Sequence, residues 1–386
     1  MKTYEEINKK IKEKTCVVAT AEEIIQIAKQ RGIKKTAEEI DVVTTGTFGA
    51  MCSSGIYLNF GHSDPPIKIN KAWLNGIPLY CGYAAVDAFL GATELDEKLN
   101  LRYGGAHVIE DLIKGKTVHL KAIGSPTDCY PKKRIETEIS LEDLNQAVMF
   151  NPRNGYQNYA VATNSSQKTI FTYMGKLEPN FGNANYATTG ELSPLLNDPF
   201  FKTIGIGTRI FFGGSQGYVT WEGTQFKSKV QRTKKGVPID PAGSLAIIGN
   251  LKEMKPEFIH AICIPKYGVS LGVGIAVPIP ILNEEILKHT LIRNKDIYTN
   301  VYDYSVSKRE RPSFGQVNYE QLSKGKIKIK EKEVKTKPLS NIKKARKIAL
   351  CLKESIEKGE FFIQKPIHFF PKNKTVKTLN IRRDKQ

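Results

Sequence analysis

Short apolar runs that end at glycine-bearing turns recur along the sequence, and they limit how the chain can fold. The clearest run is Arg209–Phe212, which predicts a buried strand and leads directly into a glycine-rich turn at 213–218. Runs this short are typical of strands, because a helix needs a longer periodic segment. The other predicted strands lie at 41–44, 117–123, 136–139, 158–162, 169–174, 244–248, 258–264, 274–277 and 302–306.

Predicted helices alternate with these strands. They lie at 4–14, 20–30, 83–90, 108–114, 141–148, 283–288 and 342–358. The mixture predicts an α/β fold, a mixed sheet with flanking helices, with α+β as the alternative. We expect a catalytic α/β body at 1–306, a basic linker with a helix that packs on the body at 307–365, and a basic C-terminal tail at 366–386.

The positive charge is concentrated near the C-terminus. Residues 324–386 hold 17 Lys and 3 Arg against 5 Glu and 1 Asp, a net charge of +14, which leaves +5 of the total +19 for all other residues. A nucleic-acid-binding core would spread basic residues over a docking face, so this distribution argues against one. The basic tail could still bind RNA or an acidic partner.

The six cysteines, at 16, 52, 81, 129, 263 and 351, form no C-x-x-C pair. The spacing therefore suggests neither a zinc ribbon nor an iron–sulfur cluster, and no motif for a bound cofactor or metal is evident. Cys81, Cys263 and Cys351 are expected in the core, while Cys16 is ambiguous. Because the N-terminus is polar and no apolar run is long enough to span a bilayer, we expect a soluble, cytoplasmic protein.

Cys129 is the strongest candidate nucleophile. It lies in G-S-P-T-D-C-Y-P at 124–131, between two prolines that restrict the backbone, and Lys132, Lys133 and Arg134 follow. Nearby cations favour the reactive thiolate, whereas the adjacent Asp128 disfavours it. The alternative is a surface loop that happens to contain a cysteine.

A second cysteine, Cys52, lies in a loop of small residues at 45–55 that includes Gly49, Ser53 and Ser54. After a strand, such a loop can present backbone N–H groups to an anion or an oxyanion. The alternative is a tight turn around a buried cysteine.

The turn formed by Gly213, Gly214, Ser215 and Gln216 could likewise cradle a carboxylate or phosphate, although it matches no known phosphate-binding motif. Arg209, just before it, could grip a carboxylate with two parallel hydrogen bonds, or it could be structural.

Two histidines follow glycine-bearing turns. His62 and His107 could act as acid or base, but the sequence gives neither a partner, so structural hydrogen bonding is the favoured interpretation for both.

Taken together, three stretches resemble the homocysteine-biosynthesis family, the L-aspartate semialdehyde sulfurtransferases of methanogenic archaea and some anaerobic bacteria. The stretches are T-T-G-T-F-G-A-M-C-S-S-G at 44–55, the Cys129 octapeptide, and 205–223 with its G-G-S-Q-G turn. The resemblance covers about residues 1 to 365. Many members continue into a pair of CBS domains, and this sequence resembles a form without them.

The resemblance implies that homocysteine is made from aspartate semialdehyde and sulfide or another sulfur donor. Cys129 is similar to the persulfide-bearing cysteine of the family, and Cys52 to its second characteristic cysteine. Electrons are expected from a small partner protein with a ferredoxin domain. Whether the chain forms a homo-oligomer stays open.

If Cys52 resolves a persulfide on Cys129, the two side chains should face one cleft, bordered by the turn at 213–217. Two other functions stay open at this point: a cysteine enzyme that forms a thioester and needs a nearby histidine, and a basic RNA-binding protein.

Overall fold

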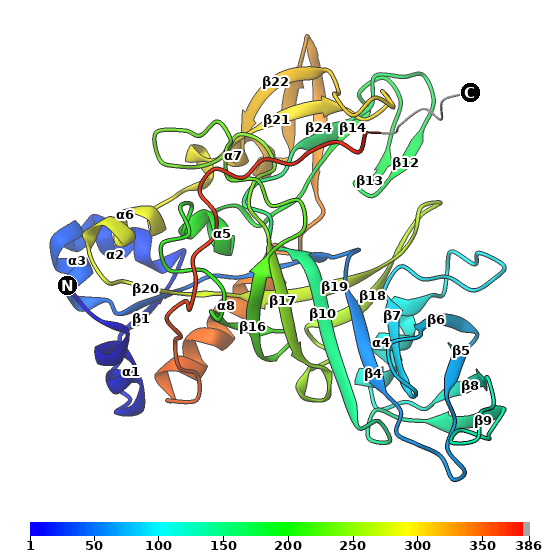
Figure 1. Cartoon of the computed structure of the whole chain (residues 1–386). Coiled ribbons are helices and arrows are strands. Elements are labelled where there is room, and N and C mark those ends of the chain that lie inside the picture. The colour runs from blue at the N-terminus through cyan, green and yellow to red at the C-terminus, as the bar shows by residue number, and fades with distance from the viewer. Residues whose placement is uncertain (381–386) are drawn as a thin grey trace.

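A computed structural model describes residues 1–380, and its largest element is a sheet of thirteen strands (Figure 1). Every neighbouring pair in this sheet is antiparallel. In sheet order the strands are β18 (Ile259–Ile264), β19 (Gly268–Ala276), β15 (Arg209–Phe212), β16 (Ser215–Glu222), β17 (Leu245–Asn250), β10 (Gln146–Asn154), β4 (Gly55–Asn59), β7 (Asp87–Gly91), β6 (Ile77–Cys81), β5 (Ile69–Leu74), β8 (Val118–Gly124) and β9 (Arg134–Ile139), with β3 (Thr47–Ala50) paired to β19.

A smaller sheet of six strands lies over part of the large one (Figure 1). Its order is β22 (Ser313–Asn318), β21 (Tyr298–Asp303), β11 (Val161–Thr163), β14 (Asn183–Tyr186), β24 (Lys332–Pro338) and β23 (Lys326–Ile329). Part of the segment predicted as a basic linker therefore contributes three strands to this sheet. The remaining strands are β1 (Val18–Thr20), β2 (Val42–Thr44) and β20 (Pro278–Pro280) in a third sheet, and the hairpin of β12 (Ile170–Thr172) and β13 (Gly175–Leu177).

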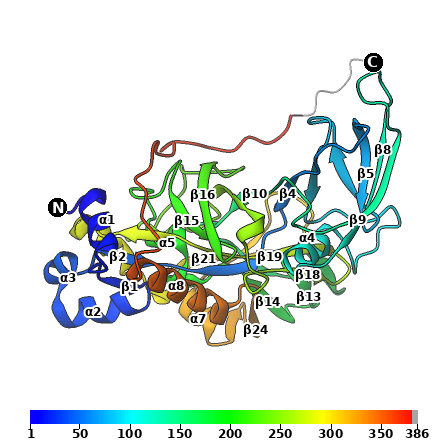
Figure 2. The same cartoon turned by 90° about the horizontal axis from the view of Figure 1, so that it is seen from below.

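The helices of residues 1–380 gather mainly at one end of an elongated molecule, and β8 and β9 lie at the other end (Figures 1 and 2). They are α1 (Tyr4–Lys12), α2 (Glu23–Arg31), α3 (Ile33–Glu39), α4 (Gly105–Ile113), α5 (Pro194–Asn197), α6 (Glu284–Thr290), α7 (Tyr319–Ser323) and α8 (Ile342–Glu357). Within the described residues, none of these helices has the length and apolar character needed to cross a membrane.

The basic helix α8 packs on the large sheet, as its amphipathic pattern predicts. Ile348 and Leu352 are fully buried against α1 and the end of β19. Gly46 permits this close approach, because a Cβ atom there would lie only 2.2 Å from the Ala345 carbonyl oxygen.

Two predicted helices, 83–90 and 141–148, are wrong. The first segment contains most of β7, whose buried residues alternate, and the second leads into β10. Both strands pair with β4, and this long-range pairing overrides the local preference of each segment.

The C-terminal segment, predicted as a basic tail, packs against the body of the protein. Phe370 lies 5.2 Å from Phe201 and 5.3 Å from Phe226, measured between ring centroids. The Ile206 N–H donates to the His368 carbonyl oxygen at 2.9 Å. Of the predicted tail, residues 381–386 lie outside the described part of the chain.

The mixture of helices and strands is confirmed, but the large sheet is antiparallel. The rule that sites gather at the carboxyl ends of strands applies to open parallel sheets. That rule therefore does not place Cys52 and Cys129 at one edge here.

Candidate active site

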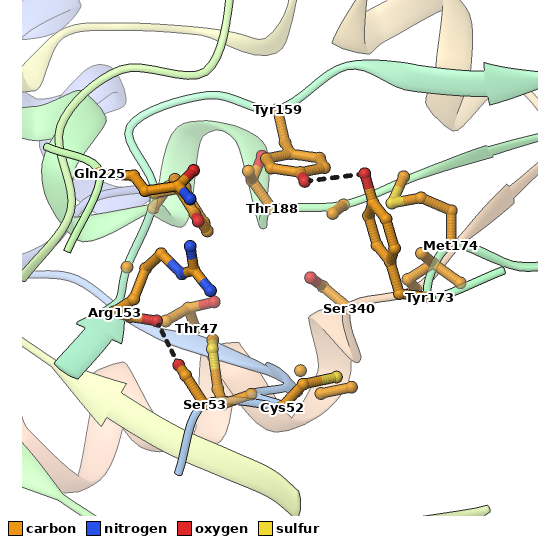
Figure 3. Close-up of a pocket in the computed structure, with 18 of the residues that line it drawn as sticks. Thr47, Cys52, Ser53, Arg153, Tyr159, Tyr173, Met174, Thr188, Gln225 and Ser340 are labelled. Atoms are coloured by element: carbon orange, nitrogen blue, oxygen red, sulfur yellow. Dashed lines mark hydrogen bonds between the residues drawn. The ribbon is translucent and has the colours of Figure 1, made fainter. Parts of the chain in front are cut away.

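A cavity of about 400 Å³ lies where the large sheet, the smaller sheet and the β12–β13 hairpin meet (Figure 3). Its wall combines one thiol, several hydroxyl groups, four tyrosines and one arginine. The lining residues are Thr47, Gly49, Ala50, Met51, Cys52, Ser53, Arg153, Gly155, Tyr156, Tyr159, Tyr173, Met174, Ala187, Thr188, Ser193, Gln225, Tyr267, Leu339 and Ser340.

Cys52 reaches the cavity from the turn that joins β3 to β4. The pairing of β3 with β19 places this turn, and the Met51 N–H donates to the Leu271 carbonyl oxygen at 2.7 Å. The Ser270 hydroxyl donates to the Cys52 sulfur at 3.2 Å, and Ser270 is 0% exposed. A fixed hydroxyl donor orients the sulfur and can stabilise negative charge that develops on it.

The two serines after Cys52 tie its turn to β10. The Ser53 hydroxyl lies 3.0 Å from Asn151 Oδ1 and 3.1 Å from the Arg153 carbonyl oxygen, and both are acceptors. The Asn151 side-chain amide donates to Ser54 Oγ at 2.8 Å. Ser54 is buried, so this hydrogen bond gives it a structural role, whereas Ser53 and Gly49 line the cavity, and substrate binding by these two residues stays a prediction.

Arg153 is a cavity residue that the sequence analysis missed. The pairing of β10 with β17 shifts register between Asn151 and Asn154, and a bulge of this kind re-aims a side chain. The guanidinium points into the cavity, between Gln225 and Thr47 (Figure 3). The sequence indicates this bulge by N-P-R-N-G at 151–155, a turn-like stretch that follows the segment 141–148, wrongly predicted as a helix.

Four tyrosines, Tyr156, Tyr159, Tyr173 and Tyr267, form much of the remaining wall. The Tyr159 hydroxyl donates to Tyr173 Oη at 3.3 Å (Figure 3). Burial raises the pKa of Tyr159 and of Tyr267, and the neighbouring Cys52 adds to the effect on Tyr267. These phenols therefore stay protonated and can donate hydrogen bonds.

Cys129 lies elsewhere, at the exposed tip of the β8–β9 hairpin. Thr127 and Tyr130 exchange two backbone hydrogen bonds of 3.1 Å, which close a tight turn around the cysteine. The Thr127 hydroxyl is 3.5 Å from the Cys129 sulfur. Asp128 is exposed beside it and does not line the cavity.

The expectation that Cys52 and Cys129 face one cleft is wrong for a single chain. Cys52 lies before the first residue of β4. The turn that contains Cys129 contacts the segment that follows the last residue of β4, because Tyr130 stacks on His62. At about 3.4 Å per residue, β4 alone separates the two by about 14 Å. A disulfide requires Cα atoms within about 7 Å.

The predicted anion cradle at 213–217 is also wrong. Its turn closes the hairpin between β15 and β16, and the Gly213 N–H already donates to the Gly274 carbonyl oxygen at 2.8 Å. Ser215 donates to Glu253, and neither Gly214 nor Gln216 lines the cavity. The turn needs glycine for its positive φ angles of 62° and 93° at 213 and 214, which is a structural requirement.

Arg209 does not line the cavity either. It donates to the Phe362 carbonyl oxygen at 3.4 Å and lies over the ring of Tyr218. These contacts support the structural alternative for Arg209 and not the carboxylate grip.

The other cysteines lie outside the cavity. Burial raises the pKa of the Cys16 thiol to about 12, and burial also raises the pKa values of Cys81 and Cys351. Cys263 is exposed, which corrects the core prediction, and its sulfur lies 3.7 Å from His107 Nε2. His107 Nδ1 accepts from the Gly104 N–H at 3.2 Å, a structural bond at the start of α4. Within residues 1–380, His, Cys, Asp and Glu form no cluster of three that could hold a metal.

Comparison with known proteins now adds to this geometry. The family model "Homocysteine biosynthesis enzyme, sulfur-incorporation" matches residues 16–363. A Methanosarcina acetivorans protein named L-aspartate semialdehyde sulfurtransferase is 50% identical over 378 residues, which cover 98% of this chain and 74% of that protein. A Methanocaldococcus jannaschii protein of the same name is also 50% identical, over 94% of this chain and 72% of its own length.

A more distant relative is an uncharacterized protein of Methanothermobacter thermautotrophicus, 28% identical over 90% of this chain and 75% of that protein. No solved structure matches the chain. The family resemblance of the cysteine stretches is confirmed by a match that spans most of the sequence, and the chain belongs to the homocysteine biosynthesis, sulfur-incorporation family.

Proposed function

We propose that this protein is an L-aspartate semialdehyde sulfurtransferase, which passes reduced sulfur through a cysteine persulfide to the aldehyde and forms L-homocysteine. Family membership and the two relatives of that name support the proposal. The structural observation that supports it best is the position of Cys52, a thiol with a buried hydroxyl donor in the wall of a cavity sized for a small molecule.

The reaction needs sulfur, electrons and protons. A sulfur nucleophile adds to the aldehyde carbon, which forms a C–S bond and moves the C=O electron pair onto oxygen. Loss of water, followed by uptake of two electrons and two protons, gives the thiol. If the sulfur arrives as a persulfide, reductive cleavage of the S–S bond takes two more electrons and two more protons and restores the cysteine.

Side chains of the cavity can stabilise the negative charge that develops on the aldehyde oxygen during this reaction. The hydroxyl groups of Thr47 and Ser340 belong to lining residues, and such donors can stabilise a developing oxyanion. They replace the glycine turn at 213–217 in that role. We assign the electrons to a protein donor of the ferredoxin type. Sulfide can add to the aldehyde directly, whereas a cysteine persulfide requires a donor that already contains an S–S bond, such as a polysulfide, which the thiolate attacks with release of the remaining sulfur chain as the leaving group.

The two cysteines have different surroundings, and we propose different roles for them. Cys129, at the exposed hairpin tip, takes up sulfur as a persulfide, and Cys52 is the thiol beside the bound aldehyde. Because they lie at opposite ends of β4, sulfur crosses between them by hairpin movement, by a second copy of the chain, or as released sulfide.

The test is persulfide mapping combined with turnover. Protein treated with a sulfur donor is digested and searched by mass spectrometry for the mass of one added sulfur atom on the Cys129 and Cys52 peptides. We expect Cys129→Ala to lose persulfide-dependent turnover, and Cys52→Ser to lose turnover while the Cys129 persulfide still forms. Full homocysteine formation by both variants would overturn the assignment.

A mixture of the two variants extends this test. If sulfur passes between chains, the mixture recovers turnover that neither variant has alone. If the mixture stays inactive, transfer occurs within one chain.

The thioester alternative receives no support from the cavity. An acyl-transferring cysteine needs a base, usually histidine, within hydrogen-bond reach. Among the described residues, the cavity lining contains no histidine.

A further inference from the structure

We infer that the cavity recognises the amino-acid end of its substrate: Arg153 binds the α-carboxylate, and the tyrosine wall holds the α-ammonium group. The aldehyde end then faces Cys52. This inference rests on the proposed function and assigns the residues that select an amino-acid aldehyde over other aldehydes.

The cavity carries a net positive charge in its wall. Arg153 is the single charged residue in its lining, and no Asp or Glu of residues 1–380 lines it. The arginines that form ion pairs in the described chain are Arg31, Arg134, Arg293 and Arg346. The half-buried Arg153 therefore presents an uncompensated positive charge, and guanidinium binds carboxylates with two parallel hydrogen bonds.

Arg153 and the turn that carries Cys52 are joined by a hydrogen bond. The Ser53 hydroxyl is 3.1 Å from the Arg153 carbonyl oxygen, so the backbone next to Cys52 is tied directly to that of Arg153. Both side chains enter the same cavity from this junction (Figure 3). A short ligand held by the guanidinium at one end, such as a four-carbon amino-acid aldehyde, can therefore direct its other end into the part of the cavity that Cys52 lines.

The tyrosines of the cavity wall can hold the ammonium group. Without a carboxylate in the wall, a cation must be held by aromatic faces and hydroxyl oxygens, and Tyr156, Tyr159, Tyr173 and Tyr267 provide both. Burial raises the pKa of Tyr156, with the nearby Arg153 acting in the opposite direction, so the arginine and the aromatic wall are neighbours. The two recognition groups therefore line the same cavity, so that one small ligand can contact both.

The test separates the two charges of the ligand. Calorimetric titration of the full chain uses L-homoserine as an unreactive substrate analogue, γ-hydroxybutyrate as the same chain without the amino group, and propanolamine as the chain without the carboxylate. Arg153→Gln is expected to weaken homoserine and γ-hydroxybutyrate binding at least about tenfold, because a charge-assisted pair is lost, and to leave propanolamine unchanged. Tyr173→Leu is expected to weaken homoserine and propanolamine and to spare γ-hydroxybutyrate.

Steady-state kinetics provide the second measurement. Arg153→Gln should raise the KM for aspartate semialdehyde at least about tenfold. Arg153→Lys, which keeps the charge and guards against a folding defect, should recover part of the loss. Arg209→Gln is the matched control, because Arg209 lies outside the cavity, and its KM should equal that of the wild type.

The outcomes distinguish this inference from the proposed function. An unchanged KM and unchanged homoserine affinity in Arg153→Gln overturn the inference while leaving sulfur transfer intact. Loss of homoserine binding in Arg153→Gln, combined with wild-type protein that makes no homocysteine, supports the amino-acid site and overturns the sulfurtransferase proposal.

Discussion

Single residues decide what the cavity can do, and the most informative contact is the one between Ser270 and Cys52. Ser270 is fully buried in β19, so its hydroxyl has no water to bond and is directed at the sulfur at 3.2 Å. A neutral hydroxyl donor in a dry environment stabilises charge more than it would in water. Cys52 is therefore a better candidate for chemistry in the cavity than its sequence neighbours alone indicate.

This contact gives a prediction for Ser270→Ala. Loss of a hydrogen bond to a charged sulfur costs about 1.5 kcal/mol, so alkylation of Cys52 by iodoacetamide at neutral pH should slow about tenfold. Peptide mapping measures the rate. Cys129 in the same sample is the internal control and should react at its wild-type rate. Equal Cys52 rates in both proteins would show that Ser270 contributes packing only.

Among the elements, the C-terminal segment departs most from its sequence pattern. It is polar and basic, yet Phe370 packs against both Phe201 and Phe226, which also contact each other, and joins the main core. The segment crosses the body as the red trace in Figure 1, and Val376 lines a second cavity beside the first. A buried aromatic ring, together with backbone hydrogen bonds such as that from the Ile206 N–H to the His368 carbonyl oxygen, holds a segment that lacks a periodic apolar face.

Two adjacent phenylalanines test this attachment. Phe370 is 7% exposed and Phe369 is 47% exposed. Phe370→Ala should lower the free energy of unfolding by about 3 kcal/mol, because it empties a filled core site. Phe369→Ala should change it by less than about 0.5 kcal/mol. Thermal unfolding monitored by circular dichroism compares the two, and equal melting temperatures would contradict the packed arrangement.

Across the whole molecule, the two cysteines of the family lie at different places on one sheet. Cys52 lies where the two main sheets meet, and Cys129 lies beyond the far end of β4 on a hairpin at the molecule's tip (Figures 1 and 2). Antiparallel pairing fixes this separation, because each strand of β4, β7, β6 and β5 reverses direction.

We therefore predict that mild oxidation of dilute protein gives no Cys52–Cys129 disulfide within a chain. Non-reducing peptide mapping measures the linkage, and gel filtration separates any cross-linked dimer. A high yield of the intramolecular link in monomeric protein would require the β8–β9 hairpin to move by more than about 7 Å.

The sequence predicts the elements of the fold and the residues of the candidate site to different extents. The strands at Arg209–Phe212 and Ile259–Ile264 and the helix α8 follow from apolar periodicity. The predicted helix at 283–288 is confirmed as α6, where the Asn283 side chain accepts a hydrogen bond from the Ile286 N–H at 3.0 Å. The misassigned segments, β7 and β10, are strands because they pair with β4, and no local pattern reports a partner so far away in sequence.

The sequence by itself determined the family, the two candidate cysteines and the mixed composition of helices and strands, because these depend on residues that are contiguous. Only the tertiary structure decided that Cys52 lines the cavity of about 400 Å³, whereas Cys129 lies at an exposed hairpin tip. Ser270 is 218 positions from Cys52 and Arg153 is about a hundred, and both reach it through strand pairing: β3 with β19, and β10 with β4. Register across a sheet is set by burial of whole faces, which a single stretch of sequence does not specify.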